Sequence, residues 1–215
     1  MGDQQEIHFF DDEKIFSGQV DYENLHGHYG PVPEGTLAGD CTPSYLYWEP
    51  AARRIFDYNP AIKFLVLLRN PVERAFAHWN MQRFKQREPL DFLEALKEEK
   101  TRLARPLSIE SRRFSYVDRG FYSRQLDRFF GLFPRDQFKI VKAEDFREHQ
   151  KETLDSIFRF LGLEQLKSIS GKDRNIVPYE REMRPDEREY LRRIFADEIL
   201  CLEKLLSWDC SDWKS

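Results

Sequence analysis

One segment, residues 63–79, constrains the fold more than any other part of the chain. It contains the uninterrupted apolar run Phe64–Leu68, which is too short for an independent helix and predicts a strand buried on both faces. Asn70 can cap a helix that Pro71 opens, and Glu73 occupies the position of a capping-box carboxylate. The pattern therefore predicts a buried strand that leads directly into a helix.

Arg69 lies at this strand-to-helix junction. The N-terminus of a helix carries positive partial charge, and its backbone N–H groups together with a guanidinium can bind an anion such as a phosphate. An ordinary corner with an exposed arginine fits the same residues equally well. The junction alone leaves both interpretations open.

The remaining elements predict an α/β protein. Phe138–Val141 is a second short strand candidate, and residues 6–10 (EIHFF) predict a short strand or strand end. Helices are expected over residues 91–100, 120–130 and 149–161 and from Pro185 onward. Strands separated by helices indicate a parallel sheet covered by helices, and 215 residues suit a single domain, 1–215.

Charge is distributed unevenly along the chain. Residues 1–60 carry eleven acids and three bases, whereas residues 101–135 carry eight arginines and three acids. A local excess of arginine suits an anionic ligand but makes no general case for nucleic acid. For any single arginine of that stretch, a solvated helical face is the alternative.

Other features point to a cytoplasmic protein without a metal. No run approaches the roughly eighteen apolar residues that cross a bilayer, and the polar start lacks the regions of a signal peptide, so no membrane association is expected. Cys41, Cys201 and Cys210 are too scattered for a disulfide framework. His26 and His28 have no third ligand at a recognisable spacing, so we expect no metal site.

Several segments together resemble one family. LRNPVERAFAHW is similar to the 3′-phosphate-binding motif of sulfotransferases that use 3′-phosphoadenosine-5′-phosphosulfate (PAPS), in the branch with bacterial sulfotransferase-domain proteins and the heparan sulfate enzymes. In the family's order, the chain also contains EIHFFD, GDCTPSYLYW, DRGFYSRQLDRFFGLFPRDQFKIVKAEDF, FRFLGL and LEKLLSWDCSDW. The resemblance thus extends over nearly the whole chain.

The resemblance implies a three-layer, P-loop-NTPase-like parallel sheet flanked by helices. It also implies transfer of a sulfuryl group from PAPS to a hydroxyl or amine of a carbohydrate or small molecule. The expected partners are this anionic nucleotide and its acceptor, with neither nucleic acid nor membrane. Such an enzyme must deprotonate the acceptor, hold the leaving phosphate and fix their geometry.

The motif match assigns catalytic roles near the N-terminus. In the heparan sulfate 3-O- and N-sulfotransferases the glutamate of the E-x-x-FF segment is the general base, and this position falls on Glu6. The histidine and aspartate of the same segment fall on His8 and Asp11. The alternative is that Glu6 ends a strand in solvent and that His8 packs in the core.

The match also assigns the cofactor contacts. Arg69 falls on the arginine that binds the 3′-phosphate, while its usual serine partner, eight residues on, is Ala77 here. Lys172 and Arg174 lie in the loop where the family places basic residues over the nucleotide phosphates, with a plain solvated loop as the alternative. Tyr122 is expected near the cofactor or acceptor, or else as a structural ring.

Two further departures bear on activity. Cys41 stands where the heparan enzymes have a lysine, and the chain contains no G-x-x-K-x-G-T-T/S loop for the 5′-phosphosulfate. We therefore expect the first strand and its phosphate loop to be missing from the domain. The alternative function is a catalytically inactive, truncated sulfotransferase-like protein that binds adenosine 3′,5′-bisphosphate or a protein partner.

Overall fold

The structure is a computed structural model that describes residues 6–165, 167–169 and 178–214. The described residues pack into two compact units. The sheet unit comprises those of 61–124 and 134–215, and the N-terminal unit those of 1–60 and 125–133. One sulfotransferase-like domain over residues 1–215 stays a prediction.

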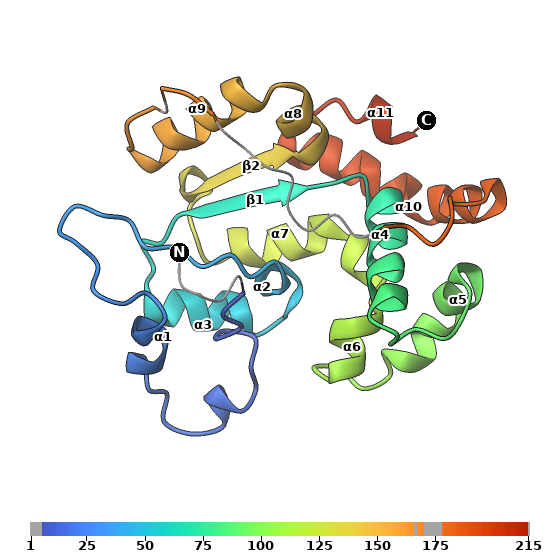
Figure 1. The fold of residues 1–215 in the computed structure, drawn as a ribbon, viewed down its shortest axis with the longest axis horizontal. Helices are drawn as coiled ribbons and strands as arrows, with labels where there is room; N and C mark the ends of the chain where they lie inside the picture. Colours follow the sequence, from blue (N-terminus) through green and yellow to red (C-terminus); the bar gives the residue numbers. More distant parts are fainter. Residues whose placement is uncertain (1–5, 166, 170–177, 215) are drawn as a thin grey trace. The chain divides into compact units, whose positions relative to one another are not determined.

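The sheet unit contains two parallel strands, β1 (Phe64–Leu68) and β2 (Phe138–Lys142) (Figure 1). The register runs from Phe64 opposite Phe138 to Leu68 opposite Lys142, and the first pair of rings stacks with centroids 4.7 Å apart. This small sheet confirms the α/β class and the parallel pairing. Because the strands are in register, the residues that follow each of them meet at one edge of the sheet.

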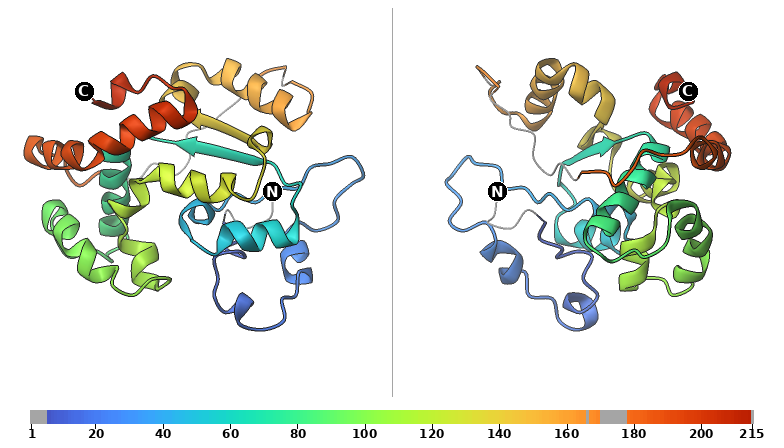
Figure 2. Two further views of the ribbon diagram at one scale, coloured as in Figure 1. Left: turned by 180° about the vertical axis from the view of Figure 1, so that it is seen from behind. Right: turned by 45° about the vertical axis from the view of Figure 1, so that its right-hand side comes forward.

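Helices pack beside β2 and against one another. α8 and α9 lie beside β2, whereas α10 packs along α4 and α11 packs on α10 (Figure 1, Figure 2). The elements of the unit besides the strands are α4 (Pro71–Phe84), α5 (Phe92–Arg102), α6 (Ile109–Phe114), η2 (Asp118–Gly120), η3 (Arg135–Gln137), α8 (Ala143–Glu148), α9 (Gln150–Leu161), α10 (Pro185–Leu206) and α11 (Ser211–Lys214).

α4 begins as its sequence predicts. The Asn70 side chain accepts a hydrogen bond from the Val72 N–H at 3.0 Å, and Pro71 occupies the first turn. Val72, Phe76 and Trp79 form its buried stripe. The strand-to-helix junction is therefore fixed by local sequence signals.

The capping box expected from Glu73 does not form. The backbone N–H of Asn70 instead donates to Glu144 Oε1 at 3.3 Å, and Glu144 is the second residue of α8. The Glu73 carboxylate turns to Arg188 of α10, 2.5 Å away. A charged partner outcompetes a neutral backbone N–H for a carboxylate.

The prediction that β1 is buried on both faces is wrong. Leu68 is buried, but Leu65 and Leu67 are 51% and 54% exposed. Successive side chains of a strand point to opposite faces, and in the described residues the face with Leu65 and Leu67 is the less covered one. Three layers, and a missing first strand and phosphate loop, stay predictions.

The N-terminal unit is built around aromatic rings. Phe9 and Phe10 are buried, with centroids 5.2 Å apart, and Phe10 also packs edge-on against Tyr45 at 5.5 Å. The elements of this unit are η1 (Ile15–Ser17), α1 (Glu23–Gly27), α2 (Ser44–Tyr47) and α3 (Ala51–Tyr58). α7 (Tyr122–Phe130) belongs to both units, because the division falls after Arg124.

The predicted strand at residues 6–10 does not form. The described backbone here is irregular, and His8 adopts a left-handed conformation with φ of 58°. The Thr42 hydroxyl accepts hydrogen bonds from the backbone N–H groups of Ile7 and His8 at 3.1 and 3.3 Å. A side chain thus takes the donors that a sheet would have used.

Candidate active site

Glu6, His8 and Asp11 lie together in the N-terminal unit and are called the acid–imidazole cluster below. His8 Nε2 lies 3.0 Å from Glu6 Oε2, and His8 Nδ1 lies 3.0 Å from Asp11 Oδ2. The side chains of Glu6 and His8 are 46% and 36% exposed, whereas that of Asp11 is fully buried. The imidazole thus links a buried carboxylate to an exposed one.

Hydrogen bonds from neighbouring side chains hold this cluster. The Ser44 hydroxyl, in the first turn of α2, donates to Asp11 Oδ2 at 2.5 Å. Asp40 accepts hydrogen bonds from the hydroxyls of Thr42, at 2.7 Å, and Tyr45, and Tyr45 in turn accepts the Phe9 N–H at 2.9 Å. The irregular segment that carries Glu6 and His8 is therefore fixed by side chains of residues 40–45.

Both carboxylates favour a charged imidazole. The hydrogen bond from His8 to Asp11, and then that to Glu6, raise the pKa of His8 to about 9. His8 is therefore protonated at neutral pH and donates from both ring nitrogens. This arrangement differs from a histidine packed in the core, and it presents Glu6 as an oriented carboxylate within reach of solvent.

Cys41 lies between Asp40 and Thr42, in the segment that holds the cluster, but it has the chemistry of an unreactive thiol. Partial desolvation of this exposed residue, followed by the negative charges of Glu6 and Asp40, raises the pKa of Cys41. The thiol therefore stays protonated at neutral pH and does not supply the positive charge that a lysine would bring there.

Arg69 lies in the sheet unit, directly after β1 and before α4. Its Nη2 is 4.0 Å from Glu73 Oε2, at the limit of an ion pair, and its side chain is 27% exposed. Among the described residues its buried Nε atom has no hydrogen-bond partner. A buried N–H without a partner is costly, so this guanidinium is suited to an anion that arrives from outside.

Tyr122 fixes the backbone of Arg69. Its ring is buried at the start of α7, and its hydroxyl donates to the Arg69 carbonyl at 3.0 Å. Burial raises the pKa of Tyr122 to about 12, so the hydroxyl remains a donor. The Glu198 carboxylate anchors the next residue by accepting the Ser123 N–H and hydroxyl, each at 2.7 Å. In this geometry Tyr122 positions Arg69.

The comparisons with known proteins identify the family. Residues 50–174 match the model of the sulfotransferase domain, which is more than half of the chain. The chain belongs to the sulfotransferase domain family. The crystal structure of a sulfotransferase from Alicyclobacillus acidocaldarius superposes with a TM-score of 0.81 at 28% identity, covering 100% of this chain and 87% of the other.

Curated sulfotransferase relatives are more distant and longer. Mouse heparan sulfate glucosamine 3-O-sulfotransferase 5 is 25% identical over 160 residues, covering 74% of this chain and 45% of that protein. Human bifunctional heparan sulfate N-deacetylase/N-sulfotransferase 2 is also 25% identical, over 166 residues, covering 74% of this chain and 18% of that protein. The chain thus spans less than half the length of these two relatives.

The sulfotransferase resemblance also concerns Ala77, Lys172 and Arg174. Ala77, on α4, is one helical turn beyond Glu73 and brings no hydroxyl to this face. Lys172 and Arg174 lie outside the described residues, so their contacts with the nucleotide stay predictions.

Within the described ranges, no set of three or more His, Cys, Asp or Glu side chains is arranged to hold a metal ion.

Two residues that contact this site were missed from the sequence. Glu144 binds the Asn70 N–H with one oxygen and the Trp213 indole N–H with the other, each at 3.3 Å. Its position two residues after β2 could have indicated this, because the carboxyl ends of parallel strands share an edge. Arg188, the partner of Glu73, lies 115 residues further along the chain, so no local sequence pattern indicates this pair.

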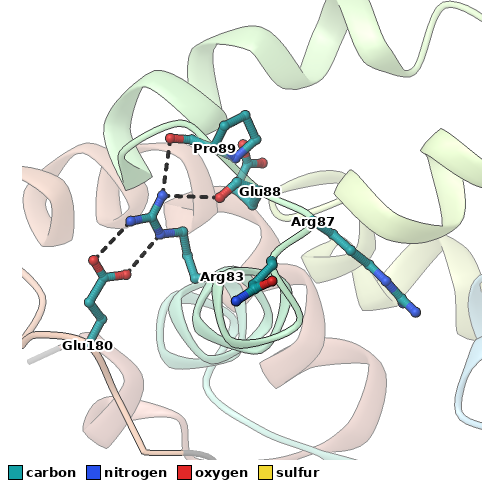
Figure 3. Close-up of a pocket in the computed structure, with 6 residues that line it drawn as sticks. Arg83, Arg87, Glu88, Pro89 and Glu180 are labelled. Carbon is teal, nitrogen blue, oxygen red and sulfur yellow. Dashed lines mark hydrogen bonds and ion pairs between the residues drawn. The ribbon is translucent and has the colours of Figure 1, made fainter.

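A pocket at the other end of α4 contains none of the predicted residues. It has a volume of about 540 Å³ and is lined by Arg83, Gln86, Arg87, Glu88, Pro89 and Glu180 (Figure 3). Arg83 binds both carboxylate oxygens of Glu180 and the carbonyls of Glu88 and Pro89, whereas Arg87 points away from this cluster. Because the Arg83 guanidinium at its centre is already paired, we do not assign the nucleotide to this pocket.

No helix in the described part of the chain has the length and apolarity to cross a bilayer.

Proposed function

We propose that the chain is a sulfotransferase that moves a sulfuryl group from PAPS to a hydroxyl or an amine. The observation that carries the proposal is Arg69, a guanidinium with a buried, unpartnered Nε among the described residues, at the N-terminus of α4. Membership of the sulfotransferase domain family supplies the chemical context.

In this proposal the nucleotide's 3′-phosphate binds Arg69. The positive end of the α4 dipole favours the same anion, and a guanidinium can bind two phosphate oxygens at once. Tyr122 holds the Arg69 backbone through the hydrogen bond to its carbonyl. Lys172 and Arg174 remain proposed contacts of the nucleotide phosphates.

Glu6 is proposed as the general base. The acceptor oxygen or nitrogen attacks the sulfur while the bond from sulfur to the bridging phosphate oxygen breaks, which releases adenosine 3′,5′-bisphosphate. The proton of the acceptor passes to Glu6. His8 orients the Glu6 carboxylate from 3.0 Å, and the buried Asp11 fixes the opposite nitrogen of the imidazole.

The acceptor class follows from the relatives. One is named a glucosamine 3-O-sulfotransferase and another an N-sulfotransferase, so oxygen and nitrogen acceptors both belong to the proposal. The proposed acceptor is a carbohydrate or a small molecule with a hydroxyl or an amine. We also propose a cytoplasmic location.

Calorimetry on the whole chain tests the nucleotide site. Adenosine 3′,5′-bisphosphate is expected to bind at least about tenfold more tightly than adenosine 5′-monophosphate, since a charge-assisted hydrogen bond contributes about 1.5–3 kcal/mol. Arg69→Ala should remove this difference. Equal affinities of the unaltered chain for the two nucleotides would contradict the proposal.

Transfer of radiolabelled sulfate from PAPS to hydroxyl- and amine-bearing sugars then tests catalysis. Transfer to either class supports the enzyme. Binding of the bisphosphate without any transfer would favour the inactive, nucleotide-binding alternative.

A further inference from the structure

Two arginines compete for the Glu73 carboxylate, and they engage it unequally. Arg188 Nη1 lies 2.5 Å from Glu73 Oε1, whereas Arg69 Nη2 lies 4.0 Å from Glu73 Oε2. The shorter contact is a full charge-assisted hydrogen bond, and the longer one is not a hydrogen bond. Glu73 is thus held mainly by Arg188.

The fold brings Arg188 to this position from a distant part of the sequence. It lies in the first turns of α10, which packs along α4, and Glu73 lies in the first turn of α4. The side chains of Arg69, Glu73 and Arg188 are 27%, 30% and 34% exposed. Charges in such partly covered positions attract each other more strongly than charges in bulk water.

Without Arg188, Glu73 would have Arg69 as its nearest described cation. The two side chains already approach to 4.0 Å, and a carboxylate and a guanidinium attract each other more strongly as they come closer. The carboxylate would then occupy the guanidinium that the proposed function reserves for the 3′-phosphate. An incoming anion would have to displace it.

We propose that Arg188 is a positioning residue for anion binding: it draws the Glu73 carboxylate aside and so keeps the Arg69 guanidinium open. This inference rests on the proposed function, because it takes Arg69 to be the phosphate ligand. Arg188 itself makes no contact with the nucleotide in this arrangement. Its effect passes through Glu73, and this distinguishes it from a second phosphate-binding arginine.

The test is calorimetry with adenosine 3′,5′-bisphosphate on four forms of the full chain. Arg188→Met, which keeps an unbranched apolar stem, is expected to weaken binding roughly tenfold, because Glu73 closes on Arg69. Glu73→Gln should bind at least as tightly as the unaltered chain. The double variant Arg188→Met/Glu73→Gln should bind the bisphosphate with an affinity within about threefold of that of Glu73→Gln, since no carboxylate remains to obstruct Arg69.

A matched control lies on the same helix. Arg193 of α10 is 78% exposed and pairs with Glu189 at 2.8 Å, so Arg193→Met changes charge equally without touching Glu73 and should leave the dissociation constant unchanged. Circular dichroism and thermal melting check that each variant is folded. Should Arg188→Met not fold, Glu73→Gln remains decisive, because a weaker affinity for the bisphosphate in that variant overturns the inference.

The outcomes separate the inference from the proposed function. If the unaltered chain binds the bisphosphate and Arg69→Ala binds it at least about tenfold more weakly, the proposed site holds. An unchanged affinity in Arg188→Met then overturns the role of Arg188. A double variant as weak as Arg188→Met would make Arg188 a direct ligand and overturn the role through Glu73. If the unaltered chain shows no preference for the 3′-phosphate, both proposals fail.

Discussion

The acid–imidazole cluster and the Arg69 junction differ in how much of their hydrogen-bonding capacity the fold already uses. Both ring nitrogens of His8 are bound by carboxylates, and the buried Asp11 also accepts the Ser44 hydroxyl. At Arg69 the nearest described carboxylate stands 4.0 Å away, and the Nε is buried without a described partner. A proton acceptor gains from being oriented in advance, whereas a site for an anion must keep its donors available.

The proposed roles predict that Glu6→Gln has the largest effect. An amide keeps the shape of the side chain but does not accept the acceptor's proton, so kcat for sulfuryl transfer should fall by roughly 10²- to 10⁴-fold. Steady-state kinetics with labelled PAPS measures this, while the affinity for adenosine 3′,5′-bisphosphate should stay within about twofold.

A control for this change is Glu23→Gln. Glu23 also belongs to the N-terminal unit and also lies near a histidine, with His26 Nδ1 3.4 Å from its carboxylate. The Glu23→Gln variant should have the same kcat for sulfuryl transfer as the unaltered chain. If both variants lose activity alike, the loss reflects charge in this unit rather than a base at Glu6.

Arg69→Ala should have the next largest effect, on binding. Losing a charge-assisted hydrogen bond of about 1.5–3 kcal/mol weakens the affinity for adenosine 3′,5′-bisphosphate roughly 10- to 150-fold. Arg69→Lys should recover part of this, because an ammonium keeps the charge but lacks the planar fork. Arg53→Ala, at a guanidinium that pairs with Asp57 in the N-terminal unit, is the control and should bind as before.

Tyr122→Phe should have a smaller effect that passes through Arg69. The change removes the hydrogen bond to the Arg69 carbonyl and leaves that partly buried acceptor without this donor, which costs about 1–3 kcal/mol of folding stability. Urea unfolding should show this loss, and the affinity for the bisphosphate should fall only severalfold. If affinity fell as far as in Arg69→Ala, Tyr122 would instead be a direct ligand.

Local signals account for what could be predicted from the sequence. The apolar run Phe64–Leu68, the cap at Asn70 and Pro71 at the first helical position specified β1, the start of α4 and the site of Arg69, because strand, cap and helix are adjacent in sequence. The carboxylates and histidine of the N-terminal cluster came from the family resemblance, and the structure brings all three together.

Long-range contacts account for what could not be predicted. The strand expected at residues 6–10 is absent because hydroxyls from residues 42 and 45 take its backbone donors. The capping role expected of Glu73 is lost to Arg188, which lies 115 residues away. Neither competitor has a fixed spacing from its target, so a pattern read over a few residues does not reveal it.

The smallest predicted effect concerns the titration of His8 and tests which carboxylate holds the imidazole. The pKa of His8 is raised from 6.5 to about 9, first by the hydrogen bond to Asp11 and then by that to Glu6. A cationic group whose pKa is higher in the folded state stabilises the fold fully below pH 6.5. This contribution is lost as the pH rises through about 9. Because His8 is partly exposed, solvent screening limits the contribution to about 1 kcal/mol or less.

NMR titration of the His8 ring separates the two partners. Asp11→Asn should lower the pKa of His8 more than Glu6→Gln does, because the Asp11 carboxylate is fully buried and little screened, whereas Glu6 is nearly half exposed. The reverse order would mean that the exposed pair dominates and that Glu6 is tied to His8 more firmly than a proton acceptor should be. Equal lowering would remove the physical difference between a buried orienting carboxylate and an exposed reacting one, on which the assignment of Glu6 as base depends.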